Sequence, residues 1–392
     1  MQITIVGGGF GGVKAALHLS KDKKSQITLI SDKPDFQYYP ALYGTATGYS
    51  HLQSWVPLGE IFAGRDNVTI IIDSIAKISK AEQTITGTSG TLYSYHTLIL
   101  ALGSITTYFG IEGLDQYAYG IKSADEIAEL KQHLLEEFSR PNAADKNFLI
   151  VGAGPTGVEL SSALGSYLKH LKKHYNKPEP KINITLIEAA PRVLPRMSEE
   201  ASRLVTARLK SLGVHVELGK KVESETADSL IVSGKPIKSH TVIWTSGVAN
   251  NPFFAANGDQ FTFAKNGKVL VDNYLRADHN IYIIGDNAAT QFSGLAQTAL
   301  RDGVFVARHI LKKSKAKYIA KMPPVVVPVG EKWAVFEYKK LRFAGLIGSL
   351  IRRAADFVGY SDILPFGQAL GVWHAQTIKE DDSYIAENVH KK

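Results

Sequence analysis

The chain has 392 residues, of which 44% are hydrophobic, and a formal net charge of +8. This length exceeds what one hydrophobic core usually supports, so two or three folded domains are expected. The chain contains no cysteine, which excludes disulfides, thiolate metal sites and dithiol redox chemistry. The scattered lysines do not distinguish a nucleotide, a lipid or a nucleic acid as partner. No stretch reaches the roughly 18 apolar residues of a membrane span and no leader is visible, so a cytosolic chain is expected.

The N-terminal segment predicts a dinucleotide site. The β-branched run "QITIV" leads into Gly7-x-Gly9-x-x-Gly12 and then a helical pattern. In such a turn the first glycine permits tight turning, the second lets a pyrophosphate approach the backbone, and the third lets the helix pack on the strand. The following strand ends at Ser31, with Asp32 directly after it. The carboxylate that usually binds the ribose is therefore either displaced or replaced by a hydroxyl.

The segment "FLIVGAGPTGVELSSAL" repeats this pattern of strand, glycine turn and helix, with Gly152, Gly154 and Gly157 at the same spacing. The next strand ends at Glu188, and a carboxylate there favours NAD(H), because it would repel a 2′-phosphate. Arg192 follows closely, so NADPH stays open. Two dinucleotide sites are useful when the nucleotides differ. An enzyme that moves electrons from NADH to FAD needs both.

A third segment makes the pattern more specific. An apolar strand ends in Gly285 and Asp286, and a helical stretch, "LAQTALRDGVFVARHIL", follows. Buried strands that end in glycine also occur at residues 96–104 and 240–248. These features together resemble the flavoprotein superfamily with two dinucleotide-binding domains, in which the late aspartate contacts FAD.

The resemblance implies an α/β fold with two Rossmann-like domains. The FAD domain is expected to be discontinuous, over residues 1–115 and 265–325, with an NAD(H) domain inserted at residues 116–264. Residues 326–392 would form a C-terminal cap that contacts the membrane.

Within that superfamily the sequence resembles the type II NADH:quinone oxidoreductases. The similar segments are "YYPALYGTATG", "GAGPTGVE", "LIEAAPRVLP" and "WTSGV". The disulfide reductases and sulfide:quinone reductases use cysteines that this chain lacks. The family's AQxAxQ quinone signature begins here at Ala296, but Arg301 replaces the second glutamine. Arg301 could narrow the quinone entrance, pair with a lipid phosphate, or indicate another acceptor.

The resemblance implies two sets of cofactor contacts. FAD would be contacted by Gly7, Gly9, Phe10, Gly11, Gly12, Ser31, Asp32, Ala101, Gly103, Asp286, Ala296 and Gln297. NADH would be contacted by Gly152, Gly154, Pro155, Thr156, Gly157, Glu159, Glu188 and Gly247.

Glu159 and Gln297 are the predicted catalytic residues. Glu159 could orient the nicotinamide or assist proton movement, or it could simply compensate helix charge. Gln297 would lie near the flavin and the acceptor, although it could be an ordinary polar helix residue. Gln297, Arg301 and Lys332 are the candidate quinone residues, and for Lys332 a solvated side chain is the alternative.

The helical pattern after residue 345 is basic and amphipathic. Leu346, Leu350 and Val358 fall on one face, whereas Arg352 and Arg353 fall on the other with Asp356. Such a helix could bury its apolar face in the core with solvated arginines outside. The resemblance instead favours a membrane interface, where each basic residue adds about 1 kcal/mol.

The resulting prediction is a respiratory-chain enzyme that oxidises NADH through FAD and reduces a membrane quinone without pumping protons. It would be peripheral to the cytoplasmic face of the cell membrane, and a homodimer is left open. The alternatives are an NAD(P)H-dependent flavin reductase of the ferredoxin-reductase or oxidase type and a non-catalytic NAD(H)-sensing flavoprotein. The twelve histidines show no ligand spacing and no basic stripe carries interleaved aromatics. Neither a metal nor a nucleic acid is therefore expected.

Overall fold

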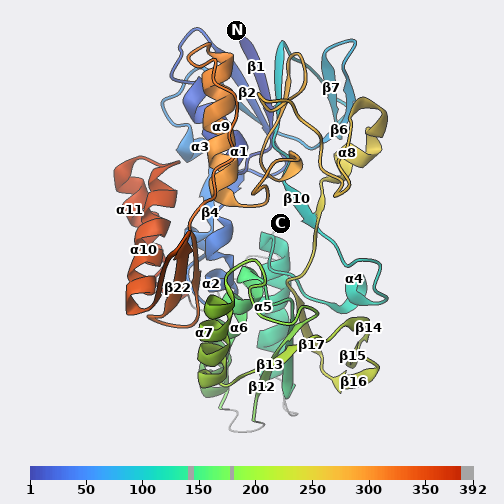
Figure 1. Ribbon diagram of the computed structural model, residues 1–392, viewed down its shortest axis with the longest axis vertical. Helices are drawn as coiled ribbons and strands as arrows, with labels where there is room; N and C mark the ends of the chain where they lie inside the picture. The colour runs from blue at the N-terminus through green and yellow to red at the C-terminus, as the bar shows by residue number, and fades with distance from the viewer. Residues whose placement is uncertain (140–144, 177–180, 381–392) are drawn as a thin grey trace.

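A computed structural model describes residues 1–139, 145–176 and 181–380. Its upper half in Figure 1 is built on a sheet with the strand order β19-β20-β9-β1-β2-β5. Strands β20, β9, β1, β2 and β5 run parallel, and only the edge strand β19 is antiparallel. The strands are β1 (Gln2–Val6), β2 (Gln26–Ser31), β5 (Val68–Ile72), β9 (Thr97–Leu100), β19 (Arg276–Asp278) and β20 (Ile281–Ile283).

This first sheet is buried on both faces, as its apolar strands require. Helices α1 (Phe10–Leu19) and α9 (Ala296–Ile310) pack against each other over one face. Apolar side chains of a three-stranded sheet and of α8 (Pro252–Ala256) cover the other face. That small sheet contains β6 (Ile75–Ser79), β7 (Thr84–Gly87) and β8 (Leu92–Ser94).

The lower half has its own parallel sheet, in the order β13-β12-β11-β17. Its strands are β11 (Asn147–Val151), β12 (Asn183–Glu188), β13 (Val214–Leu218) and β17 (Thr241–Trp244). Three helices share its core: α5 (Ala124–Ser139), α6 (Pro155–His174) and α7 (Glu199–Ser211). The small sheet β14 (Val222–Thr226), β15 (Ser229–Val232) and β16 (Lys235–Lys238) packs on the opposite face.

Two chain segments connect the halves. Strands β10 (Ser104–Thr106) and β18 (Val248–Asn250) pair antiparallel where the chain passes between them. The indole Nε1 of Trp244 donates a hydrogen bond to the Thr107 carbonyl 3.0 Å away. The two sheets and their order agree with the predicted α/β class. The exact domain boundaries stay a prediction.

The remaining short elements lie between these strands and helices along the chain. They are β3 (Asp35–Gln37), η1 (Tyr39–Ala41), α2 (Leu42–Ala46), η2 (His51–Gln53), β4 (Trp55–Pro57), α3 (Leu58–Ile61), α4 (Leu114–Tyr117), η3 (Gly258–Gln260) and η4 (Gly285–Asn287).

The C-terminal part forms a third unit at the left of Figure 1. An antiparallel sheet of β21 (Val325–Pro328), β22 (Ala334–Tyr338) and β23 (Leu341–Gly345) precedes α10 (Leu346–Ser361) and α11 (Phe366–Ala375). Strand β21 packs on α6, β22 on α7, and α11 on η2. This unit therefore contacts both halves of the molecule. The predicted C-terminal region extends to residue 392, but residues 381–392 lie outside the described part.

One prediction about α10 is wrong. Arg352 and Asp356 are not on an outward polar face but are buried, at 8% and 6% exposure. They face the protein because a carboxylate from another helix meets the guanidinium there. The apolar side chains of α10 point outward instead, with Leu346, Leu350 and Val358 about 60% exposed.

Candidate functional site

The first glycine turn joins β1 to α1 and leaves no room for side chains at its ends. Gly7 has a φ of +115°, and a Cβ on it would lie 2.2 Å from the Ala101 carbonyl oxygen. A Cβ on Gly12 would lie 1.9 Å from the Gly7 carbonyl oxygen. Gly9, the residue that caps α1, would meet nothing within 4 Å. The turn is thus closed toward the protein and open at the helix N-terminus, where a pyrophosphate binds in such turns.

The other predicted FAD residues gather around this turn. Ser31 ends β2 and is buried, with its Oγ 2.4 Å from the position of a Cβ on Gly8, whereas Asp32 is exposed. Phe10 begins α1, and its ring contacts that of Phe36 edge to face, with 4.9 Å between centroids. Gly11 packs beneath Ile284 and the Ala299 carbonyl of α9.

The loop after β9 and the turn after β20 are joined by a residue that the sequence patterns did not single out. The Asn287 amide is fully buried, accepts a hydrogen bond from the Gly103 amide and donates one to its carbonyl. The Oγ of Ser104 donates to the Asp286 carboxylate 2.7 Å away. The structure thus brings Ala101, Gly103 and Asp286 close together beside the first glycine turn, and their contact with FAD stays a prediction. The tripeptide "GDN" was the available signal for Asn287.

The quinone candidates lie on two different elements. Gln297 is half-buried in the first turn of α9, next to Ala296. Arg301 is exposed one turn later and donates to the Lys321 carbonyl. Lys332 is exposed in the turn between β21 and β22, which belongs to the C-terminal unit. Its side chain therefore matches the solvated alternative.

The second glycine turn has the same geometry as the first. Gly152 has a φ of +106°, and a Cβ on Gly157 would lie 1.8 Å from the Gly152 carbonyl oxygen. Gly154 caps α6 and is open, again with nothing within 4 Å of a Cβ. Pro155 and Thr156 begin α6 directly after it. Residues of both turns therefore fit the pyrophosphates of two dinucleotides.

Glu188 lies at the end of β12, next to the second turn. Its two carboxylate oxygens accept hydrogen bonds from the Ala153 and Ala190 amides, at 2.7 and 2.8 Å. Gly247 lies beyond β17 with a φ of +77°, and a Cβ there would lie 2.5 Å from the Phe109 ring. The carboxylate is thus held at the strand end that carries the adenosine ribose in this type of domain.

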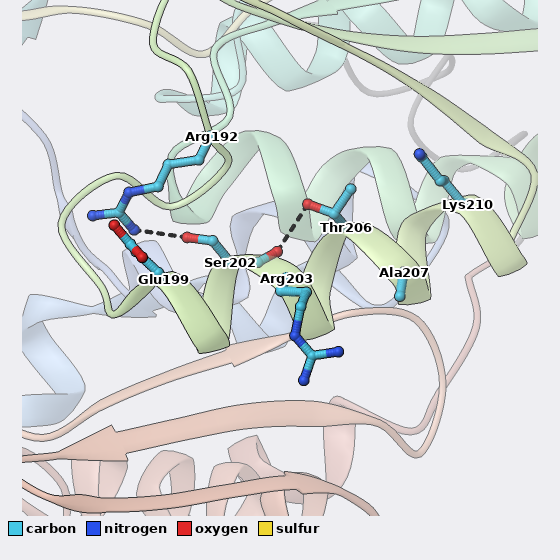
Figure 2. Close-up of a pocket in the computed structure, with 7 residues that line it drawn as sticks. All are labelled: Arg192, Glu199, Ser202, Arg203, Thr206, Ala207 and Lys210. Atoms are coloured by element: carbon cyan, nitrogen blue, oxygen red, sulfur yellow. Dashed lines mark hydrogen bonds between the residues drawn. The ribbon is translucent and has the colours of Figure 1, made fainter.

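Arg192 is held away from that carboxylate. Its guanidinium donates to the Pro195 and Met197 carbonyls and to the Ser202 hydroxyl. Figure 2 shows this arginine at one end of a surface hollow of about 500 Å³ along α7. None of the predicted site residues lines this hollow. Because these protein atoms occupy the guanidinium, the structure offers no free cation from Arg192 for a 2′-phosphate.

Glu159 forms a buried ion pair that joins the two halves to the C-terminal unit. Its Oε1 lies 3.0 Å from Nη1 of Arg352, and Nε of Arg352 lies 2.8 Å from Oδ2 of Asp356. The other guanidinium nitrogen donates to the Pro40 carbonyl. Glu159 lies past the first turn of α6. Its carboxylate is therefore poorly placed to compensate the partial positive charge at the N-terminus of this helix.

The surroundings of Glu159 change its protonation. Burial raises the pKa of Glu159 to about 7, even though Arg352 opposes the shift. Tyr38 donates a hydrogen bond to Asp356, and burial raises the pKa of Tyr43. Both tyrosines belong to the segment "YYPALYGTATG". A carboxyl group that titrates near neutrality beside this segment can hold or release a proton there.

Two glycine turns on two parallel sheets, each followed by the N-terminus of a helix, define a class of protein that holds two dinucleotides in adjacent domains. The sequence profile of the pyridine nucleotide-disulphide oxidoreductases matches residues 1–303. The chain belongs to this family. Having no cysteine, it cannot perform the dithiol chemistry for which the family is named.

Individual relatives show which members of this family the chain resembles. The chain is 29% identical to type II NADH:quinone oxidoreductase Ndh of Mycobacterium tuberculosis, over 89% of this chain and 82% of that protein. It is 26% identical to the type II NADH:quinone oxidoreductase of Staphylococcus aureus, over 79% and 81%. Its fold matches that of NDH2 from Plasmodium falciparum in complex with NADH, with a TM-score of 0.85, 19% identity, and 96% and 97% coverage. The predicted resemblance to type II NADH:quinone oxidoreductases is confirmed.

Residues 1–139, 145–176 and 181–380 contain no group of three or more histidine, aspartate or glutamate side chains that could hold a metal ion. Within these ranges, no helix is both long enough and apolar enough to span a bilayer.

Proposed function

We propose that this protein binds FAD at the first glycine turn and NADH at the second, oxidises NADH, and passes two electrons to a quinone without pumping protons. The observation that carries this proposal is the pair of matching turns, at Gly7–Gly12 and Gly152–Gly157, on separate parallel sheets. The relatives named type II NADH:quinone oxidoreductases support the choice of donor and acceptor.

The two cofactors are held by different sets of residues. The first turn and Asp286 hold FAD, and the second turn and Glu188 hold NADH. FAD supplies the redox chemistry, because a flavin accepts a hydride and releases its electrons to an acceptor. The task of the chain is therefore to position the two rings and to exclude water from them.

Glu159 is the proposed proton-handling residue. It lies on the helix that begins at the NADH turn and is bridged by Arg352 to the Pro40 carbonyl. A quinone needs protons as well as electrons, and a carboxyl group with a pKa near 7 can supply one at neutral pH. Gln297 is the proposed polar contact near the flavin and the quinone, with Arg301 one turn further along α9.

The C-terminal unit is the proposed membrane contact. Apolar side chains of β23, α10 and α11 are exposed together: Leu341, Phe343, Leu346, Ile347, Leu350, Val358, Phe366 and Leu370. Such a surface is costly in water and favourable in a bilayer interface. Peripheral attachment at the cytoplasmic face would place the site beside the lipid-soluble acceptor. A homodimer stays a prediction.

Steady-state assays test the activity. The purified protein should be yellow, should oxidise NADH faster than NADPH, and should do so far faster with a short-chain quinone than with oxygen. Stimulation only by oxygen or dyes would favour a flavin reductase or oxidase. Bleaching of the flavin by NADH without turnover would favour the NAD(H)-sensing alternative. Protein that takes up no FAD would refute the proposal.

Liposome flotation tests the membrane contact. The double variant Leu346→Asp, Leu350→Asp changes only exposed positions of α10, so it should fold and oxidise NADH but fail to float. Leu92→Asp is the matched control, because Leu92 is 67% exposed on β8, away from α10. Equal flotation of the double variant and the parent would exclude this surface.

A further inference from the structure

The turn that carries Asp286 is flanked by two lysines that no sequence motif singled out. Lys122 donates from Nζ to the Ser104 hydroxyl, 3.2 Å away, and Ser104 donates to the Asp286 carboxylate. On the other flank, Lys268 donates from Nζ to the Ser293 hydroxyl at 2.7 Å, and Ser293 donates to the Gly285 carbonyl at 2.9 Å. Each lysine thus reaches the turn through one serine.

Lys122 is held by contacts from both halves of the molecule. Its carbonyl accepts a hydrogen bond from Nε2 of Gln37, which lies on β3 of the first half. Its amide donates to the Glu126 carboxylate in the first turn of α5. The residue is half-buried, and burial lowers the pKa of its ammonium while Asp286 and Glu126 oppose the shift. The backbone of Lys122 is thus anchored on both sides, and its partly buried ammonium is held by the Ser104 hydroxyl.

Lys268 has the same electrostatic setting. It is half-buried, burial lowers the pKa of its ammonium, and Asp286 opposes that shift. Two positive charges therefore face the single carboxylate of the turn. The two ammonium groups offset the negative charges of Asp286 and of its acidic neighbours Glu126 and Asp32, so each lysine makes the site less repulsive to a bound anion.

Tyr39 marks the same place from a third direction. The residue is 44% exposed, yet burial raises the pKa of its hydroxyl to about 12, with Asp286, Asp32 and Glu126 as the charged contributors. Asp286 is thus linked to Lys122 through Ser104 and acts on Tyr39 by its charge, where the loop after β9 and the Asp286 turn meet.

We infer that Lys122 and Lys268 are positioning residues of the FAD site, which orient the Gly285–Asp286 turn through Ser104 and Ser293 and offset part of the negative charge around it. The inference rests on the proposed FAD binding. Reduction adds negative charge to a flavin, and nearby positive charge favours the form with more negative charge. Removing either lysine should therefore weaken FAD binding and make bound FAD harder to reduce.

The test uses the full-length FAD-loaded protein and measures two quantities that a purely structural role would not change together. These are the FAD dissociation constant and the two-electron reduction potential, the latter by equilibration with a reference dye. For Lys122→Met and Lys268→Met we expect the equilibrium constant for reduction of bound FAD to fall about tenfold. This corresponds to a reduction potential about 30 mV more negative for a two-electron couple. Lys122→Arg keeps the charge and should restore the parent potential. Lys80→Met is the control, because Lys80 pairs with Asp278 instead.

Each outcome decides the inference. It is overturned if both methionine variants keep the parent potential and FAD affinity within twofold. It is also overturned if Lys122→Arg shifts the potential as far as Lys122→Met does. If Lys122→Met holds no FAD, retention by Lys122→Arg supports the role of charge, and loss by both refutes it. A parent protein that binds no FAD would instead refute the proposed function, and this result is recognised before any variant is made.

Discussion

Glu159 and Arg352 are 193 positions apart in the chain, yet their side chains form a buried ion pair with 3.0 Å between Oε1 and Nη1. Glu159 belongs to the helix that begins at the NADH turn, and Arg352 belongs to the helix whose opposite face is apolar and exposed. The pair therefore connects the proposed NADH site to the proposed membrane contact through one guanidinium.

Replacing Glu159 with glutamine should lower the rate of NADH:quinone turnover by about 100-fold, because a general acid usually contributes at least that much. The parent rate should fall as the pH rises through about 7, since the proton of Glu159 is lost there. The variant should lack that descending limb. Steady-state rates between pH 5.5 and 8.5 measure both effects. An unchanged pH profile in the variant would assign the limb to another group.

Replacing Arg352 with methionine should destabilise the fold. The substitution leaves the carboxylates of Glu159 and Asp356 buried without their cation, and breaking a buried pair in this way costs about 3 kcal/mol or more. The free energy of unfolding is measured by urea denaturation at pH 7.5. Arg353→Met is the control, because Arg353 lies 4.5 Å from the Trp373 ring, a contact worth about 1 kcal/mol or less. Equal losses in the two variants would mean that the buried pair has no special weight.

Replacing Glu188 with alanine should raise the KM for NADH about tenfold and leave FAD bound. A hydrogen bond to a charged group contributes about 1.5 kcal/mol or more, which corresponds to this factor. NADH titration and the visible flavin absorbance report the two properties separately. Glu217→Ala is the control, because Glu217 lies on the adjacent strand β13. Loss of flavin colour in the Glu188 variant would mean that the two dinucleotide sites have been exchanged.

Replacing Glu225 with glutamine should stabilise the protein relative to the parent increasingly as the pH rises above about 4.5, with the full difference reached near pH 8. Burial raises the pKa of the Glu225 carboxyl to about 8. The folded protein therefore holds this proton more tightly than the unfolded chain does, and the parent loses stability as the pH rises from about 4.5 to 8.

Glutamine has no such proton to lose. The melting temperature of the Glu225 variant should exceed that of the parent by roughly 2 °C or more at pH 8.5, but not at pH 5. Glu223→Gln, an exposed change on the same strand, should show no difference at either pH. A constant offset at both pH values would show that Glu225 does not titrate in this range.

Much of the site was predictable because its information is local. A glycine turn between a strand and a helix depends on backbone angles and close approaches within a few residues, so Gly7, Gly12, Gly152 and Gly157 could be assigned from spacing alone. The strand ends at Ser31 and Glu188 followed from apolar runs that stop. The parallel order around each turn follows from the same strand and helix alternation.

The orientation of α10 could not be predicted in this way. Helical periodicity separates Leu346, Leu350 and Val358 from Arg352 and Asp356, but a period of 3.6 residues does not say which stripe faces the protein. That choice depends on Glu159 and the Pro40 carbonyl, which lie far away in the chain. The same holds for Lys122 and Ser104, which meet at Asp286 only after three separate segments fold together. Local patterns therefore determined the turns and strands, whereas the partners of buried charges depended on contacts between distant segments, because an ion pair forms wherever folding places its two members.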